Sequence, residues 1–87
     1  MRESVIEYYL VERVRELGGE VRKVQWIGRR GAPDRVVMLP GCTVWVELKA
    51  PGEKAKPHQV REHERMRKMG QRVEVIDSIE GVDALLA

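Results

Sequence analysis

Apolar residues recur every three to four positions over residues 3–17, which is the spacing of an amphipathic helix. At about 100° per residue, Ile6, Leu10 and Val14 fall within about 80° of one another on the helix surface. Gly18 follows and is typical of a helix end. The pattern predicts a first helix over 3–17 with one apolar face turned toward a core.

The remainder of the chain alternates between strand and helix patterns. It predicts strands over 20–27, 35–39, 43–49 and 72–76, a helix over 57–69, and a short closing helix that ends at Leu86. The short connection that contains the turn Pro40-Gly41 predicts an antiparallel hairpin, and the helix before the last strand predicts that this strand lies parallel to a neighbour. The order α-β-β-β-α-β-α therefore predicts an α/β fold with a mixed sheet flanked by helices.

Length and composition limit the class of protein. The 87 residues suffice for one small domain over 1–87, and 43% hydrophobic with 34% charged residues is typical of a globular chain. No apolar run approaches the roughly 18 residues of a membrane span and no secretory signal is visible, so we expect a cytoplasmic protein with no membrane partner. The single cysteine, Cys42, cannot form a disulfide within the chain, and we expect it to be a small core residue near a strand start.

The net charge of +2 conceals a strong asymmetry along the chain. Residues 1–20 carry three basic and five acidic groups, and residues 73–87 carry four acidic groups and no basic one. The middle segment, residues 21–72, therefore holds thirteen basic and five acidic groups, a net charge of +8. This asymmetry favours a polyanionic partner, although a solvated surface of lysine and arginine accounts for the charge equally well.

Two carboxylates and a lysine are brought together by the predicted hairpin. Strand periodicity places Glu47 and Lys49 side by side on one face of the third strand, where on their own they are typical of a surface ion pair. Asp34, however, precedes the second strand, and the start of one antiparallel strand lies beside the end of the other. Asp34 can thus reach Glu47. Two adjacent carboxylates repel unless a cation lies between them, and hard divalent cations prefer oxygen ligands.

Glu7 is a third carboxylate of interest, because it falls near 100° on the helical wheel, inside the apolar arc. A carboxylate in that position is either paired or functional, since burying an unpaired charge is expensive. We favour a role in binding metal. The alternative is a structural ion pair with Arg35 or Lys49.

These residues resemble a known nuclease signature. Pro33-Asp34, followed after twelve residues by Glu47-Leu48-Lys49, is similar to the PD-(D/E)XK motif, whose superfamily shares a restriction-endonuclease-like core of order α-β-β-β-α-β. With Glu7 on the first helix, the loop over 28–34, and Gln59 on the helix after the third strand, the chain resembles the VRR-NUC family. It looks like the stand-alone form found in phages and bacteria, and the resemblance extends over essentially the whole sequence.

The resemblance implies roles for the candidate residues. The expected ligands of Mg²⁺ or Mn²⁺ are Glu7, Asp34, Glu47 and the backbone carbonyl of Leu48. The ion would activate a water and offset charge on the scissile phosphate. Lys49 would hold that water or stabilise the transition state, with a general-base role also conceivable. Gln59 would orient Lys49 or the water, or else be a solvated helix residue. The expected catalytic residues are Asp34, Glu47, Lys49 and Gln59.

Basic residues flank this set in the sequence and could grip phosphates on either side of a cut. Such contacts position DNA without reading its bases. The expected DNA-binding residues are Arg29, Arg30, Arg35, Lys54, Lys56, His58 and Arg61. Trp26 and Trp45 alternate with strand positions, and we expect them in the core or at an interface rather than as platforms for stacked bases.

The leading functional hypothesis is a metal-dependent endonuclease that selects DNA by structure. The resemblance to stand-alone VRR-NUC proteins implies a homodimeric resolvase of four-way (Holliday) junctions, and two sites related by a twofold axis would suit paired symmetric nicks. We therefore expect a homodimer acting on branched DNA in a bacterial or phage-infected cell. The alternatives are a flap or nicking endonuclease on other DNA structures, and a noncatalytic DNA-binding module whose acidic groups are structural.

Overall fold

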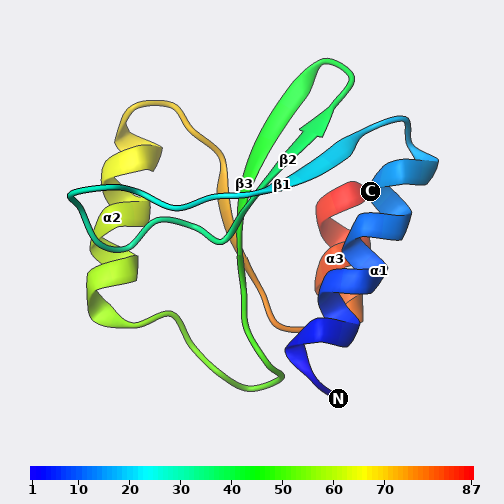
Figure 1. Ribbon diagram of the computed structural model, residues 1–87, viewed down its shortest axis with the longest axis horizontal. Coiled ribbons are helices and arrows are strands. Elements are labelled where there is room, and N and C mark those ends of the chain that lie inside the picture. The colour runs from blue at the N-terminus through cyan, green and yellow to red at the C-terminus, as the bar shows by residue number, and fades with distance from the viewer.

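The computed structural model describes all residues, 1–87, and shows three helices and one four-stranded sheet (Figure 1). In chain order the elements are α1 (Glu3–Glu16), β1 (Glu20–Lys23), β2 (Arg35–Leu39), β3 (Cys42–Leu48), α2 (Pro57–Lys68), β4 (Val73–Ile76) and α3 (Ile79–Leu86). The strands lie in the order β1-β2-β3-β4, with the first two pairings antiparallel and the third parallel. The predicted mixed sheet is confirmed.

The helices cover the sheet on opposite faces. Helices α1 and α3 lie together on one side, and α2 lies on the other (Figure 1). The main core forms under α1 and α3, because alternate residues of β3 point that way. Ten side chains make up this core: Ile6, Leu10, Val14, Val37, Val44, Val46, Leu48, Ile76, Val82 and Leu85.

The layer between α2 and the sheet has a different character. Its buried apolar residues Met66 and Val73 lie outside the main core cluster, and three buried side chains on this face are polar or charged: Glu47, Glu62 and His63. Burying such groups is unfavourable unless they are hydrogen-bonded or paired. The buried polar residues on the sheet face under α2 therefore indicate a functional site rather than a stabilising core.

Strand β1 ends at Lys23, four residues earlier than predicted. The last backbone bond on this edge joins the N–H of Val24 to the carbonyl of Asp34 at 2.9 Å. Residues 24–33 then leave the sheet and cross to α2 (Figure 1). Gly31 has φ of +95°, and a Cβ there would lie 2.7 Å from the His58 carbonyl oxygen, so the crossing segment packs directly on α2.

Cys42 lies in a different environment from the one that the sequence predicted. Cys42 begins β3 as expected, but its side chain is exposed, because it lies at the tip of the β2–β3 hairpin rather than over the core. The expectation of a core cysteine was wrong.

None of the three helices combines the length and the apolar character needed to cross a membrane.

Candidate active site

The β2–β3 hairpin brings Asp34 and Glu47 together. Arg35 pairs with Val46 in the sheet register, so Asp34 stands one position further along, opposite Glu47. The Oδ2 atom of Asp34 accepts a hydrogen bond from the backbone N–H of Leu48 at 2.9 Å. This bond fixes the Asp34 carboxylate against the end of β3, beside the carboxylate of Glu47.

Glu47 is the most buried carboxylate of the protein, with 2% of its surface exposed. Its Oε2 atom accepts a hydrogen bond from Nε2 of Gln59 at 2.9 Å and lies 3.3 Å from Nζ of Lys49. Its Oε1 atom is buried and has no hydrogen-bond partner within the protein. One oxygen is thus held by the protein and the other is free to bind a ligand.

The electrostatics of the pair favour a cation. Burial raises the pKa of Glu47, and the neighbouring negative charge of Asp34 raises it further, while Lys49 and Gln59 oppose the shift. Two ionised carboxylates are therefore unfavourable here without a compensating charge. The unpartnered Oε1 atom and the oxygen donors of Asp34 fit a hard divalent cation.

Gln59 is oriented by the start of α2. Lys56 is the N-cap, Pro57 takes the first helical position, and Gln59 is the third residue of the helix. The Oε1 atom of Gln59 accepts a hydrogen bond from the backbone N–H of Lys56 at 2.8 Å. Because the oxygen is occupied in this way, the amide nitrogen must face Glu47, which accepts its hydrogen bond. The alternative of a solvated helix residue does not hold in the structure.

Lys49 extends from the end of β3 into the same site. Its backbone N–H donates to the carbonyl of Ile76 at 2.9 Å, which holds it in line with β4. Its side chain is only 12% exposed, and its ammonium is directed to the carboxylate of Glu47. The structure thus gathers the four expected catalytic residues, Asp34, Glu47, Lys49 and Gln59.

Glu7 is not brought into this group. It forms an ion pair with Arg35, whose Nε atom lies 2.7 Å from the Glu7 carboxylate, and Nη1 of Arg35 also donates to the carbonyl oxygen of Asp34 at 3.0 Å. Both partners are largely covered, with 31% and 16% of their side chains exposed. The structure therefore shows the alternative ion pair. It gathers no group of three or more His, Cys, Asp or Glu side chains that could hold a metal.

The expected DNA-binding residues divide into three groups. His58 lies near the positive charges of Arg30, Lys56 and Arg61. Burial is the largest cause that lowers the pKa of His58, and these charges lower it further. Arg29 forms an ion pair with Glu62, with 3.8 Å between Nε of Arg29 and Oε1 of Glu62. Lys54 lies in the exposed loop after β3. Arg35 is not placed with the others, because its guanidinium is committed to Glu7.

Glu62 is a buried residue that the sequence interpretation missed. It is 4% exposed, accepts a hydrogen bond from Nε1 of Trp26 at 2.8 Å, and accepts another from Nε of Arg65 at 2.9 Å. Burial alone would raise the pKa of Glu62, but the bonds from Arg65 and Trp26 and the charge of Arg29 lower it overall. Glu62 thus ties the crossing segment 24–33 to α2.

A spacing signal for this buried face exists in the sequence. Gln59, Glu62, His63 and Met66 follow the i, i+3, i+4, i+7 pattern of one helix face, which marks the side turned to the sheet. His63 is also fully buried, with no hydrogen-bond partner for its Nε2 atom, and burial lowers its pKa. Three of these four residues are polar, and α2 is rich in basic residues. The sequence of α2 is therefore typical of a solvent-exposed basic helix, and its buried face was not recognised.

Comparison with known proteins decides the family. A solved structure described as a VRR_NUC domain superposes with a TM-score of 0.89 and is 48% identical in sequence, covering 97% of this chain and 92% of that one. The chain belongs to the VRR-NUC family. A relative named "Putative nuclease p44" comes from Acyrthosiphon pisum secondary endosymbiont phage 1; it is 52% identical over 79 residues, which is 90% of this chain and 85% of the relative. No model in a scan of protein families matched the sequence.

Membership in the VRR-NUC family agrees with the architecture described above. The four-stranded mixed sheet with helices on both faces is the restriction-endonuclease-like fold of this family. Asp34 lies before β2, Glu47 and Lys49 at the end of β3, and Gln59 at the start of α2. In this VRR-NUC chain the candidate residues thus lie together near the start of β2 and the end of β3, on the face covered by α2.

Proposed function

We propose that this VRR-NUC chain is a metal-dependent DNA endonuclease. Its active site, formed around Asp34 and Glu47, would hydrolyse phosphodiester bonds of DNA. The observation that carries the proposal is the buried Glu47 carboxylate, which has one unpartnered oxygen and a second carboxylate beside it. Asp34, Glu47 and the carbonyl of Leu48 would hold Mg²⁺ or Mn²⁺. When bound, the ion supplies positive charge to the scissile phosphate and lowers the pKa of a coordinated water.

The protein groups around the carboxylates have separate tasks in this proposal. Lys49 donates a hydrogen bond to the phosphate as negative charge develops, because its ammonium is held at the site and shielded from solvent. Gln59 holds one oxygen of Glu47 and so directs the other toward the metal. Glu7 acts through Arg35, which contacts the backbone of Asp34; the ligand role expected for Glu7 would need that ion pair to open.

DNA binding in this proposal is electrostatic and independent of sequence. The segment of net charge +8 contains every catalytic candidate. Of the cations around His58, Lys56 and Arg61 lie at the start of the helix that carries Gln59, and Arg30 lies in the crossing segment. Contacts from such residues to phosphates fix the orientation of DNA without reading bases. Arg29, Arg30, Lys54, Lys56, His58 and Arg61 form the proposed contact set.

The proposed substrate is branched DNA, foremost a four-way junction cut by a homodimer. Resemblance to stand-alone VRR-NUC proteins supports this choice, and a twofold pair of sites would place two cuts symmetrically. The phage origin of one relative supports a setting in an infected bacterial cell. A flap or nicking endonuclease remains the second candidate, since the electrostatic contact set favours no single branched form.

A panel of DNA structures tests the proposal. Equal concentrations of four-way junction, flap, nicked duplex and linear duplex are incubated with Mg²⁺, with Mn²⁺ or with EDTA, and sedimentation in parallel gives the number of subunits. We expect metal-dependent cleavage, fastest on the junction, that is lost in Asp34→Asn while DNA binding persists. Glu64→Gln is the control, because Glu64 is an exposed carboxylate on α2. DNA binding without any cleavage and without any effect of metal would instead favour the noncatalytic module.

A further inference from the structure

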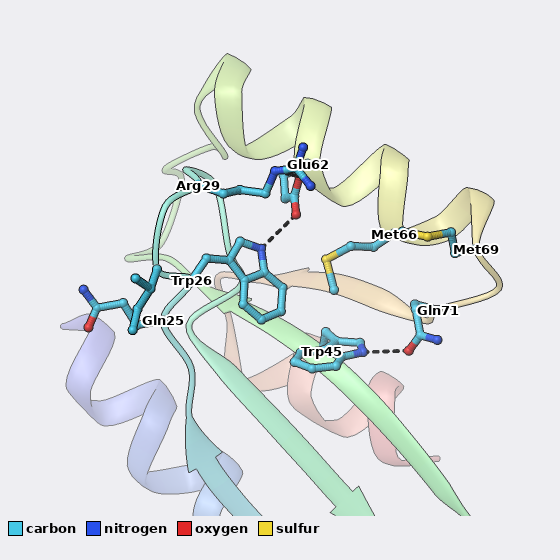
Figure 2. Close-up of a pocket in the computed structure, with 9 residues that line it drawn as sticks. Gln25, Trp26, Arg29, Trp45, Glu62, Met66, Met69 and Gln71 are labelled. Carbon is cyan, nitrogen blue, oxygen red and sulfur yellow. Dashed lines mark hydrogen bonds and ion pairs between the residues drawn. The ribbon is translucent and has the colours of Figure 1, made fainter.

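The α2 face of the sheet holds a second feature beside the carboxylates. It is an open pocket of about 590 Å³, within the usual size range of ligand sites. Its walls come from the crossing segment 24–33, from β3 and from α2, and its apolar surface is supplied mainly by Trp26, Trp45, Met66 and Met69 (Figure 2). Both tryptophans of the protein therefore stand in this one pocket.

The two indole rings offer their faces and not their N–H groups. Nε1 of Trp26 donates to Glu62 at 2.8 Å, and Nε1 of Trp45 donates to Gln71 at 2.9 Å, so both polar edges are occupied (Figure 2). The ring centroids lie 5.7 Å apart and the rings are tilted by 59°. A flat ligand cannot be sandwiched between rings in mutual contact at that angle. It can stack on the open face of one ring with its edge against the other.

The pocket adjoins the proposed active site. Trp45 and Glu47 point to the same face of β3 and are two residues apart, roughly 7 Å at the usual strand rise. Glu62, which anchors Trp26, lies one helical turn beyond Gln59 on α2. Measured along the helix axis of B-form DNA, roughly 7 Å is the rise of about two base-pair steps. A strand whose phosphate lies at Glu47 therefore has a nearby nucleotide within reach of the pocket.

We propose that this pocket binds an unstacked nucleobase of the DNA strand held at Asp34 and Glu47. The inference rests on the proposed nuclease function. Aromatic faces bind bases by stacking, and the exposed guanidinium of Arg29 at the rim suits the attached phosphate. The one carboxylate in the lining, Glu62, is buried and paired with Arg65, so it does not repel DNA.

Such a pocket would select DNA by structure. Stacking on an aromatic ring tolerates every base, because each base has a π face. Extruding a base from a regular duplex is costly, whereas a base that is already unpaired can be captured at little cost. Trp26 and Trp45, which the sequence pattern placed in a core or interface, would thus favour distorted or branched DNA over linear duplex.

Intrinsic fluorescence tests the proposal without a label, because both tryptophans line the pocket. The full chain is titrated in EDTA with a short single-stranded oligonucleotide and with the same oligonucleotide lacking its bases. We expect saturable quenching by the first and little by the second. The proposed homodimer should form without changing this fluorescence. A tryptophan fluorescence change on raising protein concentration alone, with no quenching by the oligonucleotide, would overturn the proposal in favour of a second copy as the occupant.

A substitution cycle distinguishes stacking from a structural role. Single abasic sites are placed at successive positions around the cut. At one position, the loss of the base should weaken binding to the wild-type chain by roughly five- to hundredfold, the range for one stacked base. That penalty should vanish in Trp45→Ala and survive in Trp45→Phe, which keeps a ring. Tyr8→Ala is the control, since Tyr8 is an exposed aromatic residue on α1. An abasic penalty that persists unchanged in Trp45→Ala would refute the proposal.

Failure of this inference and failure of the nuclease proposal give different results. If cleavage requires Asp34 but an abasic site at any position leaves DNA binding unchanged, the pocket does not bind a base and the nuclease assignment stands. If bases quench the tryptophans but Asp34→Asn cleaves as fast as the wild type, base binding stands and the catalytic assignment fails.

Discussion

Replacing Glu47 with glutamine should stabilise the metal-free protein while abolishing its activity. Glutamine has nearly the same shape as glutamate but no charge. In the structure, Glu47 is 2% exposed, its Oε1 atom lacks a partner, and Asp34 adds a second negative charge. These features raise the pKa of Glu47 even with Lys49 at 3.3 Å, so the ionised form is, on balance, disfavoured in the folded state.

The size of the effect follows from the charge on the unpartnered oxygen, since the glutamine amide that takes its place is polar but neutral. A buried polar group without a hydrogen bond costs about 1–3 kcal/mol, and somewhat more when it is charged. The lost attraction to Lys49 offsets part of the gain, so we expect Glu47→Gln to raise the metal-free unfolding free energy by about 1–2 kcal/mol. For a domain of this size, that corresponds to an increase in Tm of about 4–15 °C.

The dependence on pH gives the same prediction a sign. A carboxyl group whose folded pKa lies above its unfolded value binds more protons in the folded state, so its contribution to stability falls as pH rises through that window. The contribution is constant below the unfolded pKa and again above the folded one. Because Glu47→Gln removes this group, the stability difference between variant and wild type should grow from about pH 4 upward and then level off.

Urea unfolding in EDTA, followed by tryptophan fluorescence, measures these differences. Glu64→Gln, which removes an exposed carboxylate from α2, should leave stability within about 0.5 kcal/mol of the wild type. Adding Mn²⁺ should stabilise the wild type and leave Glu47→Gln nearly unchanged, since a ligand stabilises only the state that binds it. The reasoning fails if Glu47→Gln is less stable than the wild type in EDTA at pH 7, or gains as much stability from Mn²⁺.

Further outcomes follow from the crossing segment, from α2 and from the basic surface. Gly31→Ala should destabilise the fold by about 1–3 kcal/mol, because the positive φ and the nearby His58 carbonyl both oppose a Cβ; thermal unfolding measures it. Glu62→Gln should lower stability by about 1–3 kcal/mol at pH 7, and because the pKa of Glu62 is lowered in the fold, the deficit should shrink as acid protonates the wild-type carboxylate; equal deficits at pH 7 and pH 3 in denaturant titrations would argue against this. Lys56→Ala should reduce the slope of log affinity against log salt for DNA by about one, measured by fluorescence anisotropy.

Local rules were sufficient for the pairing of Asp34 with Glu47. A two-residue hairpin connection fixes the strand register, and the register places the residue before β2 opposite the next-to-last residue of β3. This part of the site depends on short-range geometry, which the sequence pattern shows directly. The role of Gln59, by contrast, was expected from the resemblance to the VRR-NUC family, and the proline that starts α2 predicted only its place near the first turn of the helix.

The parts that were missed depend on long-range packing. The wheel position of Glu7 pointed toward the protein interior, but it could not decide between a metal ligand and the ion pair with Arg35 that the structure shows. The bond between Trp26 and Glu62 spans 36 residues and forms only because the segment after β1 leaves the sheet to pack on α2. Strand periodicity through Trp26 gave no sign of that departure, so the tryptophan pocket could be recognised only in the folded chain.

Single-turnover cleavage of a labelled four-way junction, with protein in excess and Mg²⁺ varied, tests the central claim most directly. We expect the wild type and Glu64→Gln to cut at the same rate, which rises with Mg²⁺ and is abolished by EDTA. Glu47→Gln should be slower by at least about 10³-fold, the loss of roughly 4 kcal/mol of transition-state stabilisation, while it binds the junction normally. Cleavage by Glu47→Gln at the wild-type rate, or cutting by the wild type that persists in EDTA, would contradict the assignment of a metal-dependent site at Asp34 and Glu47.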